Sequence, residues 1–377
     1  MRTALVNGRV LTESGLRTGH VVLVEDARIS AIVPACDASL RGAELHDLQG
    51  RMLAPGFIDC QVNGGGDVLF NAAPTVDTIR RIGAAHRRFG TTGFLPTLIS
   101  DDVEVMRAAI DAVERAIAAG VPGVLGIHLE GPFLAPERKG IHDPDKFLVL
   151  DERLIDTIAA LRGGRTLITL APERCPPRLI AQFVARGVIV SAGHTAATYA
   201  DTYAALNVGL RGFTHLFNAM SPLQSREPGV VGAALEDPAS WCGVIVDAEH
   251  VHPATLRVAL AVKPRGRMFL VTDAMPPVGG TSTSFELYGR RIDCASGVCR
   301  GPDGTLAGSA LDMASAVRNT VTLLGVATEE ALRMASSYPA AFLELGAVTG
   351  SLRAGARADL VELDDAFQVH RTWIGGV

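Results

Sequence analysis

Residues 56–66 read GFIDCQVNGGG, and this stretch shows the pattern on which the fold of the chain depends. It is largely apolar, but Asp59, Gln61 and Asn63 stand at alternate positions directly before three glycines. Alternate residues of a β-strand point to the same side. We therefore predict a buried strand that directs a carboxylate and two amides toward one place and then ends in a flexible turn.

Seven further strand-like apolar segments follow, and amphipathic helix-like segments lie between them. The predicted strands are 52–62, 92–99, 123–131, 165–173, 187–195, 212–218, 241–251 and 267–275. The predicted helices are 75–89, 101–119, 151–162, 176–186, 197–208 and 253–262, with two more within 307–325 and 328–345. Eight alternations with nearly continuous apolar strands favour an α/β fold with a closed (β/α)8 or TIM barrel. An open doubly wound sheet is the competing architecture, but no G-x-G-x-x-G motif follows an early strand.

Both ends of the chain consist of short β-like runs. Asn7-Gly8 lies between two apolar runs and predicts a hairpin. Residues 20–34 read as strand, turn and strand, and 351–377 have no helical period. Because chain termini often lie close together, we predict one small sheet domain from residues 1–52 plus 347–377. The barrel would then comprise residues 53–346.

Composition excludes several classes of function. The chain has 377 residues, 48% hydrophobic and 20% charged, with a formal net charge of −5. Without a block of like charges, a nucleic-acid surface or a polybasic membrane anchor is not expected. No apolar run is long enough to cross a membrane, and the first residues lack the apolar core of a signal peptide. We expect a cytoplasmic protein.

The six cysteines are scattered and form no C-x-x-C pair. In a cytosolic chain of this length, such a distribution predicts buried, reduced thiols. Cys294 and Cys299 lie on either side of Gly297, so a disulfide across a hairpin is the alternative, which we do not favour.

Nearly every predicted barrel strand ends in a side chain that can bind a metal or transfer a proton: Gln61, Glu130, Glu173, His194, His215, His250 and Asp273. Barrel enzymes assemble their sites at these strand ends, so the pattern predicts an active site. Glu130, His194 and His215 form the best metal-binding set, because a carboxylate and two imidazoles suit Zn²⁺, and also Fe²⁺. His128 shares the strand face of Glu130 and is a rival ligand, although hydrogen-bonded support of the ligands is its preferred role.

Asp273 stands alone after an apolar run at the end of the last predicted barrel strand. Elsewhere such a residue would cap a turn before the prolines, but here it faces the same mouth as the metal set. A carboxylate beside a metal-bound water can accept its proton and return it to a leaving group. Asp273 is therefore the predicted catalytic acid/base.

Short motifs along the chain resemble those of the amidohydrolase superfamily, and within it the N-acetylglucosamine-6-phosphate deacetylase family. They are APGFID, HLEGPFL, TLAPE, SAGHT, THLFNAM, REPG, DAEHVHP, VTDAM and LAGSAL, and the resemblance extends from NGRV to GSLRAGARADLV at 350–361. It implies a TIM barrel with a small β-sandwich from both termini, usually as a homodimer. It also implies hydrolytic deacetylation of N-acetyl-D-glucosamine 6-phosphate by a metal-activated water. One divalent metal ion per subunit is implied, with Zn²⁺ expected and Fe²⁺ or Co²⁺ as alternatives.

Carried over residue by residue, the resemblance assigns metal binding to Glu130, His194 and His215 and acid/base catalysis to Asp273. It assigns substrate binding to Gln61, Ile141, His142, Asn218, Ala219, Arg226, His250, Leu306, Ala307 and Gly308. Arg226 would reach the phosphate from the neighbouring subunit, since a guanidinium binds phosphate oxygens bidentately. His250 would hydrogen-bond the substrate and polarise the acetyl carbonyl.

The stretch at 56–66 departs from much of the superfamily. Where other members have a His-x-His pair that holds a second metal, this chain has Gln61 and Asn63. A neutral amide is a poor ligand for a zinc-like ion, so we predict one metal per site. Alternative functions are the same chemistry on N-acetylgalactosamine 6-phosphate or on another N-acyl substrate, and a non-catalytic scaffold with this barrel. The intact metal set and Asp273 argue against the scaffold.

Overall fold

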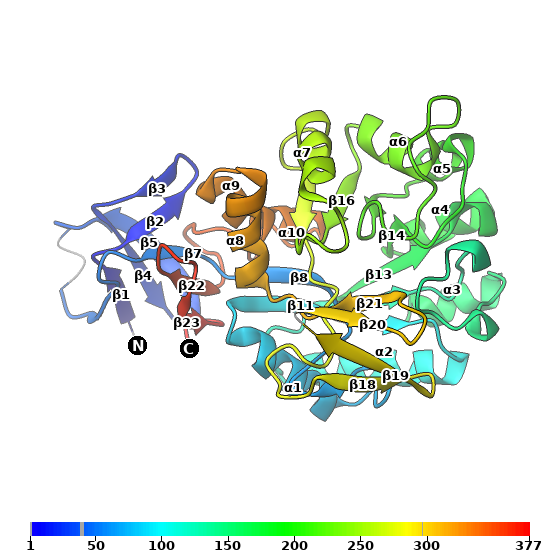
Figure 1. Cartoon of the computed structure of the whole chain (residues 1–377). Helices are drawn as coiled ribbons and strands as arrows, with labels where there is room; N and C mark the ends of the chain where they lie inside the picture. Colours follow the sequence, from blue (N-terminus) through cyan, green and yellow to red (C-terminus); the bar gives the residue numbers. More distant parts are fainter. Residues whose placement is uncertain (1, 38–40, 296) are drawn as a thin grey trace.

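The centre of the protein is a parallel barrel of eight strands. The computed structural model describes residues 2–37, 41–295 and 297–377. Its strands pair in sequence order, which confirms the predicted barrel (Figure 1): β8 (Phe57–Val62), β11 (Thr91–Ile99), β12 (Gly126–Glu130), β13 (Arg165–Leu170), β14 (Ile189–Ala192), β15 (Gly212–Phe213), β16 (Trp241–Val244) and β17 (Met268–Leu270). A parallel bridge between Val62 and Ala274 closes the barrel between its last and first strands.

The barrel strands are buried on both faces. Every residue of β8 and β11 is buried, which explains why these strands are continuously apolar and do not alternate. Most helices cover the outside of the barrel with a single apolar stripe. Helix α2 (Val103–Ala118), for example, buries Met106, Ala109, Ile110 and Val113, which follow helical spacing.

The other helices are α1 (Val76–Arg87), α3 (Glu152–Ile158), α4 (Pro177–Ala185), α5 (Tyr199–Leu206), α6 (Gly229–Glu236), α7 (Pro253–Val262), α8 (Met313–Leu324), α9 (Thr328–Met334) and α10 (Ser337–Phe342). Helix α6 is missing from the sequence prediction, because it is buried on nearly all sides and so lacks an amphipathic period. The prediction of one helix within 328–345 was wrong. Pro339 has no N–H for a continuous helix, but the first turn of α10 tolerates it.

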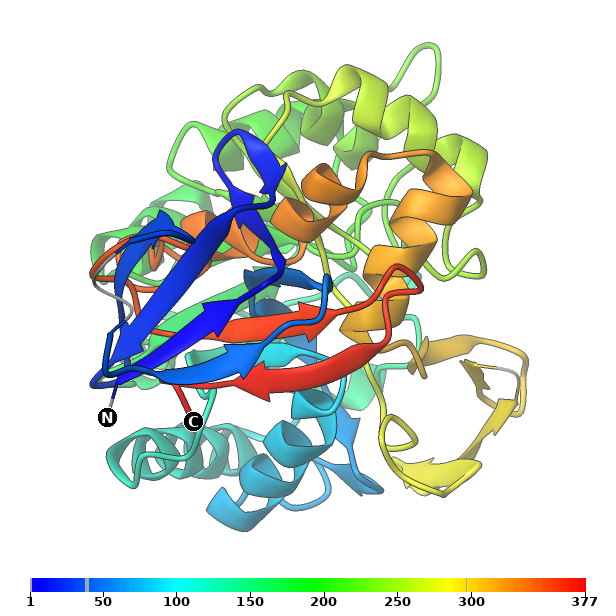
Figure 2. The ribbon, with the colours of Figure 1, turned by 90° about the vertical axis from the view of Figure 1, so that its left-hand side faces the viewer.

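Strands from the two ends of the chain form two sheets beside the barrel. One sheet contains β1 (Arg2–Val6), β4 (His20–Glu25), β5 (Arg28–Pro34) and β6 (Glu44–Asp47). The other has the order β23 (Val369–Trp373), β22 (Leu360–Leu363), β7 (Met52–Pro55), β2 (Arg9–Thr12) and β3 (Gly15–Arg17). Strands from both termini thus share one sheet, as Figure 2 shows. The exact domain boundaries, 1–52 plus 347–377 and 53–346, stay a prediction.

The hairpin predicted at Asn7-Gly8 was wrong. Strands β1 and β2 flank this pair but belong to different sheets. A type I′ hairpin needs positive φ at both central residues, and here Asn7 has φ 57° while Gly8 is not among the residues with positive φ. Gly8 instead allows a close approach, because a Cβ there would lie 2.4 Å from Leu48 Cδ1. The strand–turn–strand predicted for 20–34 is confirmed by the pairing of β4 with β5.

An antiparallel sheet that the sequence did not reveal follows the last barrel strand. It consists of β18 (Ser284–Leu287), β19 (Arg290–Ala295), β20 (Val298–Arg300) and β21 (Leu306–Ser309). Cys294 and Cys299 face each other across β19 and β20 and form a disulfide, so the expectation of six reduced thiols was wrong. Cys36 is exposed, which is a second departure from the predicted buried thiols. Opposite positions of an antiparallel pair bring the two side chains together.

Two glycines, β9 (Gly64–Gly65), pair with β10 (Val68–Leu69) at the end of β8. They form the turn predicted after Asn63. No helix within the described ranges is long and apolar enough to span a membrane.

Candidate active site

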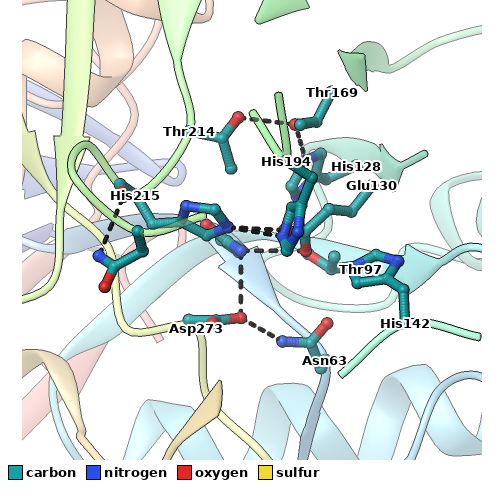
Figure 3. A network of polar contacts seen from close by, with 12 residues as sticks. Asn63, Thr97, His128, Glu130, His142, Thr169, His194, Thr214, His215 and Asp273 are labelled. Atoms are coloured by element: carbon teal, nitrogen blue, oxygen red, sulfur yellow. Dashed lines mark hydrogen bonds and ion pairs between the residues drawn. The ribbon is translucent and has the colours of Figure 1, made fainter. Parts of the chain in front are cut away.

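The predicted metal ligands meet at the carboxyl ends of the barrel strands (Figure 3). Glu130 is the last residue of β12, and His194 and His215 each lie two residues beyond their strands, β14 and β15. One ligand atom from each of the three lies within 4.8 Å of the others, and all three residues are buried. The structure therefore brings together side chains that are far apart in the sequence.

The three ligand atoms are arranged as a metal would require. Glu130 Oε1 lies 3.1 Å from His194 Nε2 and 2.9 Å from His215 Nε2, and the two Nε2 atoms are 3.1 Å apart. His194 donates from Nδ1 to the Arg138 carbonyl at 2.8 Å, and this bond turns Nε2 toward Glu130 and His215. A cation between these atoms would satisfy them, and the donor set fits Zn²⁺ or a similar ion.

Glu130 is held in its charged form. Burial alone would raise the pKa of this carboxyl, but the hydrogen bonds with His194 and His215 outweigh burial and keep the pKa well below its usual range. A carboxylate that stays ionised is a ready metal ligand.

Asp273 adjoins the three predicted ligands and is held by two amides. Its Oδ1 accepts hydrogen bonds from Asn63 Nδ2 at 2.6 Å and from Gln61 Nε2 at 3.1 Å. The same Gln61 amide donates to Glu130 Oε2 at 3.0 Å, so it links the two carboxylates. Burial, followed by the nearby charge of Glu130, raises the pKa of Asp273. Gln61 and Asn63 therefore point to one place, as predicted, whereas the Asp59 carboxylate is directed to Thr272 instead.

Three of these residues have a strained backbone. His194, His215 and Asp273 have φ values of 48°, 34° and 53°, a left-handed region that non-glycine residues seldom adopt. Each such residue costs on the order of 1 kcal/mol or more and persists only where the surrounding structure imposes it. Here the turn directly after each strand brings the side chain back over the barrel mouth.

His128 lies below the metal set and does not join it. Its Nδ1 is hydrogen-bonded to Thr97 Oγ1 at 3.1 Å and its Nε2 to Thr169 Oγ1 at 2.8 Å. Both ring nitrogens are therefore used, which leaves none for a metal. Glu173, another member of the predicted ring, accepts from Thr195 Oγ1 and from Ala196 N, both at 2.6 Å, and so supports the loop after His194.

A pocket of about 330 Å³ opens above the predicted ligands. Most of the predicted substrate-binding residues line it: Ile141, His142, Asn218, Ala219, His250, Leu306 and Gly308. Gln61 lies beneath the pocket, and Ala307 is fully buried behind it. Arg226 is exposed and lies outside the pocket of its own chain.

The sequence reasoning missed several residues that line this pocket. Arg138 belongs to a short 3-10 helix (η2, Pro136–Arg138), and Thr305 and Met275 lie beside β21. Arg138 and Thr305 lie outside the recognised motifs, and Met275 ends the VTDAM motif but was not singled out; loops of this kind do not reveal their course in sequence. Asn63, which was not among the predicted substrate-binding residues, reaches Asp273 directly; its alternation with Gln61 was the available signal.

Two histidines of the pocket are oriented by neighbours. His250 is bonded through Nδ1 to Asp247 Oδ2 at 2.6 Å, and this contact fixes the orientation of the ring. His142 is bonded through Nδ1 to Ser100 Oγ at 2.9 Å. In both histidines the Nδ1 atom is therefore occupied, which leaves Nε2 as the ring nitrogen for a ligand in the pocket.

This combination of fold and site belongs to a known class. The profile of the amidohydrolase family matches residues 52–377, which include the whole barrel and the C-terminal strands. The chain belongs to the amidohydrolase family, whose members are metal-dependent hydrolases.

Individual relatives act on acetylated sugar phosphates. N-acetylgalactosamine-6-phosphate deacetylase of Shewanella sp. (strain ANA-3) is 43% identical, over 98% of this chain and 93% of the relative. The crystal structure of N-acetylglucosamine-6-phosphate deacetylase from Pasteurella multocida superimposes with a TM-score of 0.96 at 35% identity, over 100% of this chain and 99% of that one. The structure of a variant of the Mycobacterium smegmatis N-acetyl-D-glucosamine-6-phosphate deacetylase, in complex with N-acetyl-D-glucosamine 6-phosphate, superimposes with a TM-score of 0.91 at 34% identity. The match covers 100% of this chain and 98% of that one.

Proposed function

We propose that this protein hydrolyses N-acetyl-D-glucosamine 6-phosphate to D-glucosamine 6-phosphate and acetate. The observation that carries the proposal is the convergence of Glu130, His194 and His215 beside Asp273. It occurs in a barrel that matches, at a TM-score of 0.91, a deacetylase bound to this sugar phosphate. Amide hydrolysis requires a polarised carbonyl and a proton for the departing nitrogen, and this set of residues can serve both needs.

Glu130, His194 and His215 would hold one divalent cation, with Zn²⁺ as the first candidate and Fe²⁺ or Co²⁺ as alternatives. When bound, a cation of this kind supplies Lewis-acid chemistry, polarising the acyl oxygen and lowering the pKa of a water molecule toward about 7. The Gln61 amide is already bonded to Glu130 and Asp273, which supports a single ion per subunit.

Asp273 would move the proton. In this mechanism its carboxylate accepts the proton of the attacking water and then delivers it to the sugar nitrogen. Asn63 and Gln61 both bond Oδ1, so Oδ2 is left for the exchange.

The segment containing Asn218 and Ala219 would contact the sugar phosphate, while His250 would hydrogen-bond the substrate and polarise its acetyl carbonyl. We propose a homodimer in which Arg226 of one subunit reaches the phosphate in the site of the other. Two observations support this arrangement: Arg226 does not line its own pocket, and the neighbouring Leu223 is 58% exposed. An exposed leucine on such a loop is what an interface would cover.

N-acetyl-D-galactosamine 6-phosphate is the second candidate substrate. The relative from Shewanella, at 43% identity, is more similar than the two solved structures at 34–35%, and it acts on the galactosamine compound. The two sugars differ in the orientation of one hydroxyl, far from the amide that is cleaved. The same residues would therefore perform the same chemistry on either one.

The proposed substrate also suggests where the protein acts. A sugar phosphate is charged and does not cross a lipid bilayer unaided. We therefore propose a cytoplasmic enzyme whose partners are small molecules and a second copy of itself. The net charge of −5 offers no support for a nucleic-acid partner.

The test is release of acetate by metal-stripped protein reconstituted separately with Zn²⁺, Fe²⁺ and Co²⁺. Both acetamido sugar phosphates, unphosphorylated N-acetylglucosamine and an N-acetyl amino acid would be compared. We expect activity only with metal, and kcat/KM highest for one of the two sugar phosphates. Failure to release acetate from either sugar phosphate with any ion would contradict the proposed function.

A further inference from the structure

A second, larger pocket lies at the opposite end of the barrel from the active site. Its volume is about 720 Å³. Its walls include the segment 120–125 that leads into β12, the segment 163–165 that begins β13, and the turn 345–349 after α10. These are the amino ends of the barrel strands, whereas Glu130 and the other predicted ligands lie at the carboxyl ends. The proposed function makes no use of this pocket.

Two arginines are the charged side chains among the described residues that line this pocket. Arg165 and Arg357 line it, and no aspartate or glutamate is among its described lining residues. Arg165 donates from Nη2 to the Glu344 carbonyl at 3.1 Å. Arg357 donates from Nε to Asp359 Oδ2 at 2.5 Å. Both guanidinium groups are therefore anchored at the edges of the pocket.

The carboxylate that holds Arg357, that of Asp359, is itself held by several hydrogen bonds. Asp359 is 2% exposed, and its Oδ2 also accepts from Thr349 Oγ1 at 2.7 Å. Its Oδ1 accepts from Gly375 N at 3.0 Å. One buried carboxylate thus holds the arginine, the turn and the C-terminal segment together, so the guanidinium is oriented in advance.

Each arginine retains a donor that nothing in the described chain uses. Arg165 Nε and Arg357 Nη2 are buried, and neither has a hydrogen-bond partner among the described residues. A buried donor without an acceptor is unfavourable, and most such groups in proteins are satisfied. An anion in the pocket would offer acceptors to the guanidinium groups that line it.

The remainder of the pocket is largely apolar, with walls formed by Val121, Val124, Leu125, Leu345, Val348 and Ile374. A sugar phosphate carries many hydroxyls and would leave them unpaired against these side chains. A molecule with an apolar body and a single charged end matches the walls and the arginines together.

We propose that this pocket binds a small organic anion, with its phosphate or carboxylate group between Arg165 and Arg357 and its apolar body on the aliphatic walls. The anion would be bound by charge-assisted hydrogen bonds from both guanidinium groups. This site is independent of the metal set and of the proposed deacetylation.

The test uses p-bromophenyl phosphate and p-bromobenzoate as probes, with uncharged p-bromobenzyl alcohol as a comparison. Crystals of the full chain would be soaked with each probe, and the anomalous signal of bromine would locate it. Titration calorimetry would measure affinity in solution. We expect bromine in this pocket for at least one of the anions, and affinity at least about tenfold weaker for the alcohol. The better of the two anions distinguishes a phosphate site from a carboxylate site.

Arg165→Gln should weaken binding at this site by about tenfold or more, because it removes the charge and leaves a single bond at most. Arg357→Gln should act in the same direction. Should the loss of the Asp359 partner prevent that variant from folding, Arg165→Gln decides alone. Arg353→Gln is the matched control, since Arg353 bonds the Gly346 carbonyl on the same turn but does not line the pocket. Bromine found only elsewhere, or equal affinity in Arg165→Gln and the wild type, would overturn the proposal.

Discussion

Gln61 shows how one side chain sets the chemistry of this site. A histidine here would offer a nitrogen to a second metal, whereas the amide donates to Glu130 Oε2 and Asp273 Oδ1 at 3.0 and 3.1 Å. It therefore joins the predicted ligand to the predicted proton carrier. Asn63 adds a second bond to the same oxygen of Asp273. The orientation of Asp273 thus depends on two neutral donors.

Asp273→Asn should abolish most of the activity and leave metal binding intact. The amide cannot accept and return a proton, and loss of general acid/base catalysis typically costs about 10²–10⁴ in kcat. Acetate release and metal content would be measured on the same preparation. Near-native turnover with a full complement of metal would contradict the role of Asp273.

Asp59 should make the stability of the protein depend on pH. Burial raises the pKa of Asp59 to about 7, despite hydrogen bonds from Thr272 and Gln61. The folded state therefore binds the proton more tightly than the unfolded chain. The resulting stabilisation is present below about pH 4 and is lost as the pH rises through about 7, up to about 4 kcal/mol in total.

Asp59→Asn removes this titration and retains a similar shape. Its unfolding free energy relative to that of the wild type should therefore rise between pH 5 and pH 8, in denaturation experiments on the metal-free proteins. Comparison of the two proteins cancels the titration of the histidines that they share. A difference that stays constant across this range would show that Asp59 titrates at an ordinary pKa.

Among the elements, the β18–β21 sheet connects a peripheral structure to the site. Its last strand, β21, supplies Leu306 and Gly308 to the pocket wall. Its core contains Cys299 and Ile292, packed against Met275 and Ile99 of the pocket wall. The Cys294–Cys299 disulfide lies within this cluster. The sheet is therefore part of the site although it stands outside the barrel.

Thiol titration of the denatured protein should find four reactive cysteines without reductant and six with it. The double variant Cys294→Ser/Cys299→Ser should lose about 2 kcal/mol of stability or less, because the closed loop is short. Denaturant unfolding would measure this loss. Its kcat should change little, since neither sulfur lines the pocket. Six reactive thiols before reduction would show that the disulfide is not formed.

At the scale of the whole molecule, the proposed site requires a second subunit. The pocket of one chain contains the metal set and Asp273, but Arg226 stands outside it. Within a homodimer, each interface residue occurs twice by symmetry, so one exposed arginine can complete two sites. A single chain would then bind the phosphate weakly.

Mixing two inactive variants should restore activity if Arg226 acts across the dimer. Arg226→Ala retains its own Asp273, and Asp273→Asn retains its own Arg226, so a mixed dimer contains one complete site. After subunit exchange at equal concentrations, about a quarter of the wild-type activity is expected. Each variant alone serves as the control. Absence of recovery in mixed dimers that are shown to form would place Arg226 outside the partner's site.

The barrel and the convergence of the predicted ligands could be read from the sequence for a physical reason. A parallel strand buried on both faces must be apolar throughout, so the few polar residues at its end stand out. Glu130, His194, His215 and Asp273 are such residues, and their common position on eight similar units predicts that they converge. A polar residue at the end of an apolar strand therefore indicates its place in the folded barrel, because every strand–helix unit has the same orientation.

Only the tertiary structure showed features that depend on contacts between distant segments. Nothing local to Asn7-Gly8 indicates that the strands on either side join different sheets, because their partners, β4 and β7, come later in the chain. Helix α6 lacks a polar face for the same reason: other elements bury it on nearly all sides. The pocket lined by Arg165 and Arg357 likewise follows from long-range packing. The sequence pattern predicts which residues are buried. Which residues pack against them is determined only by the tertiary structure, because burial does not depend on the identity of the partner.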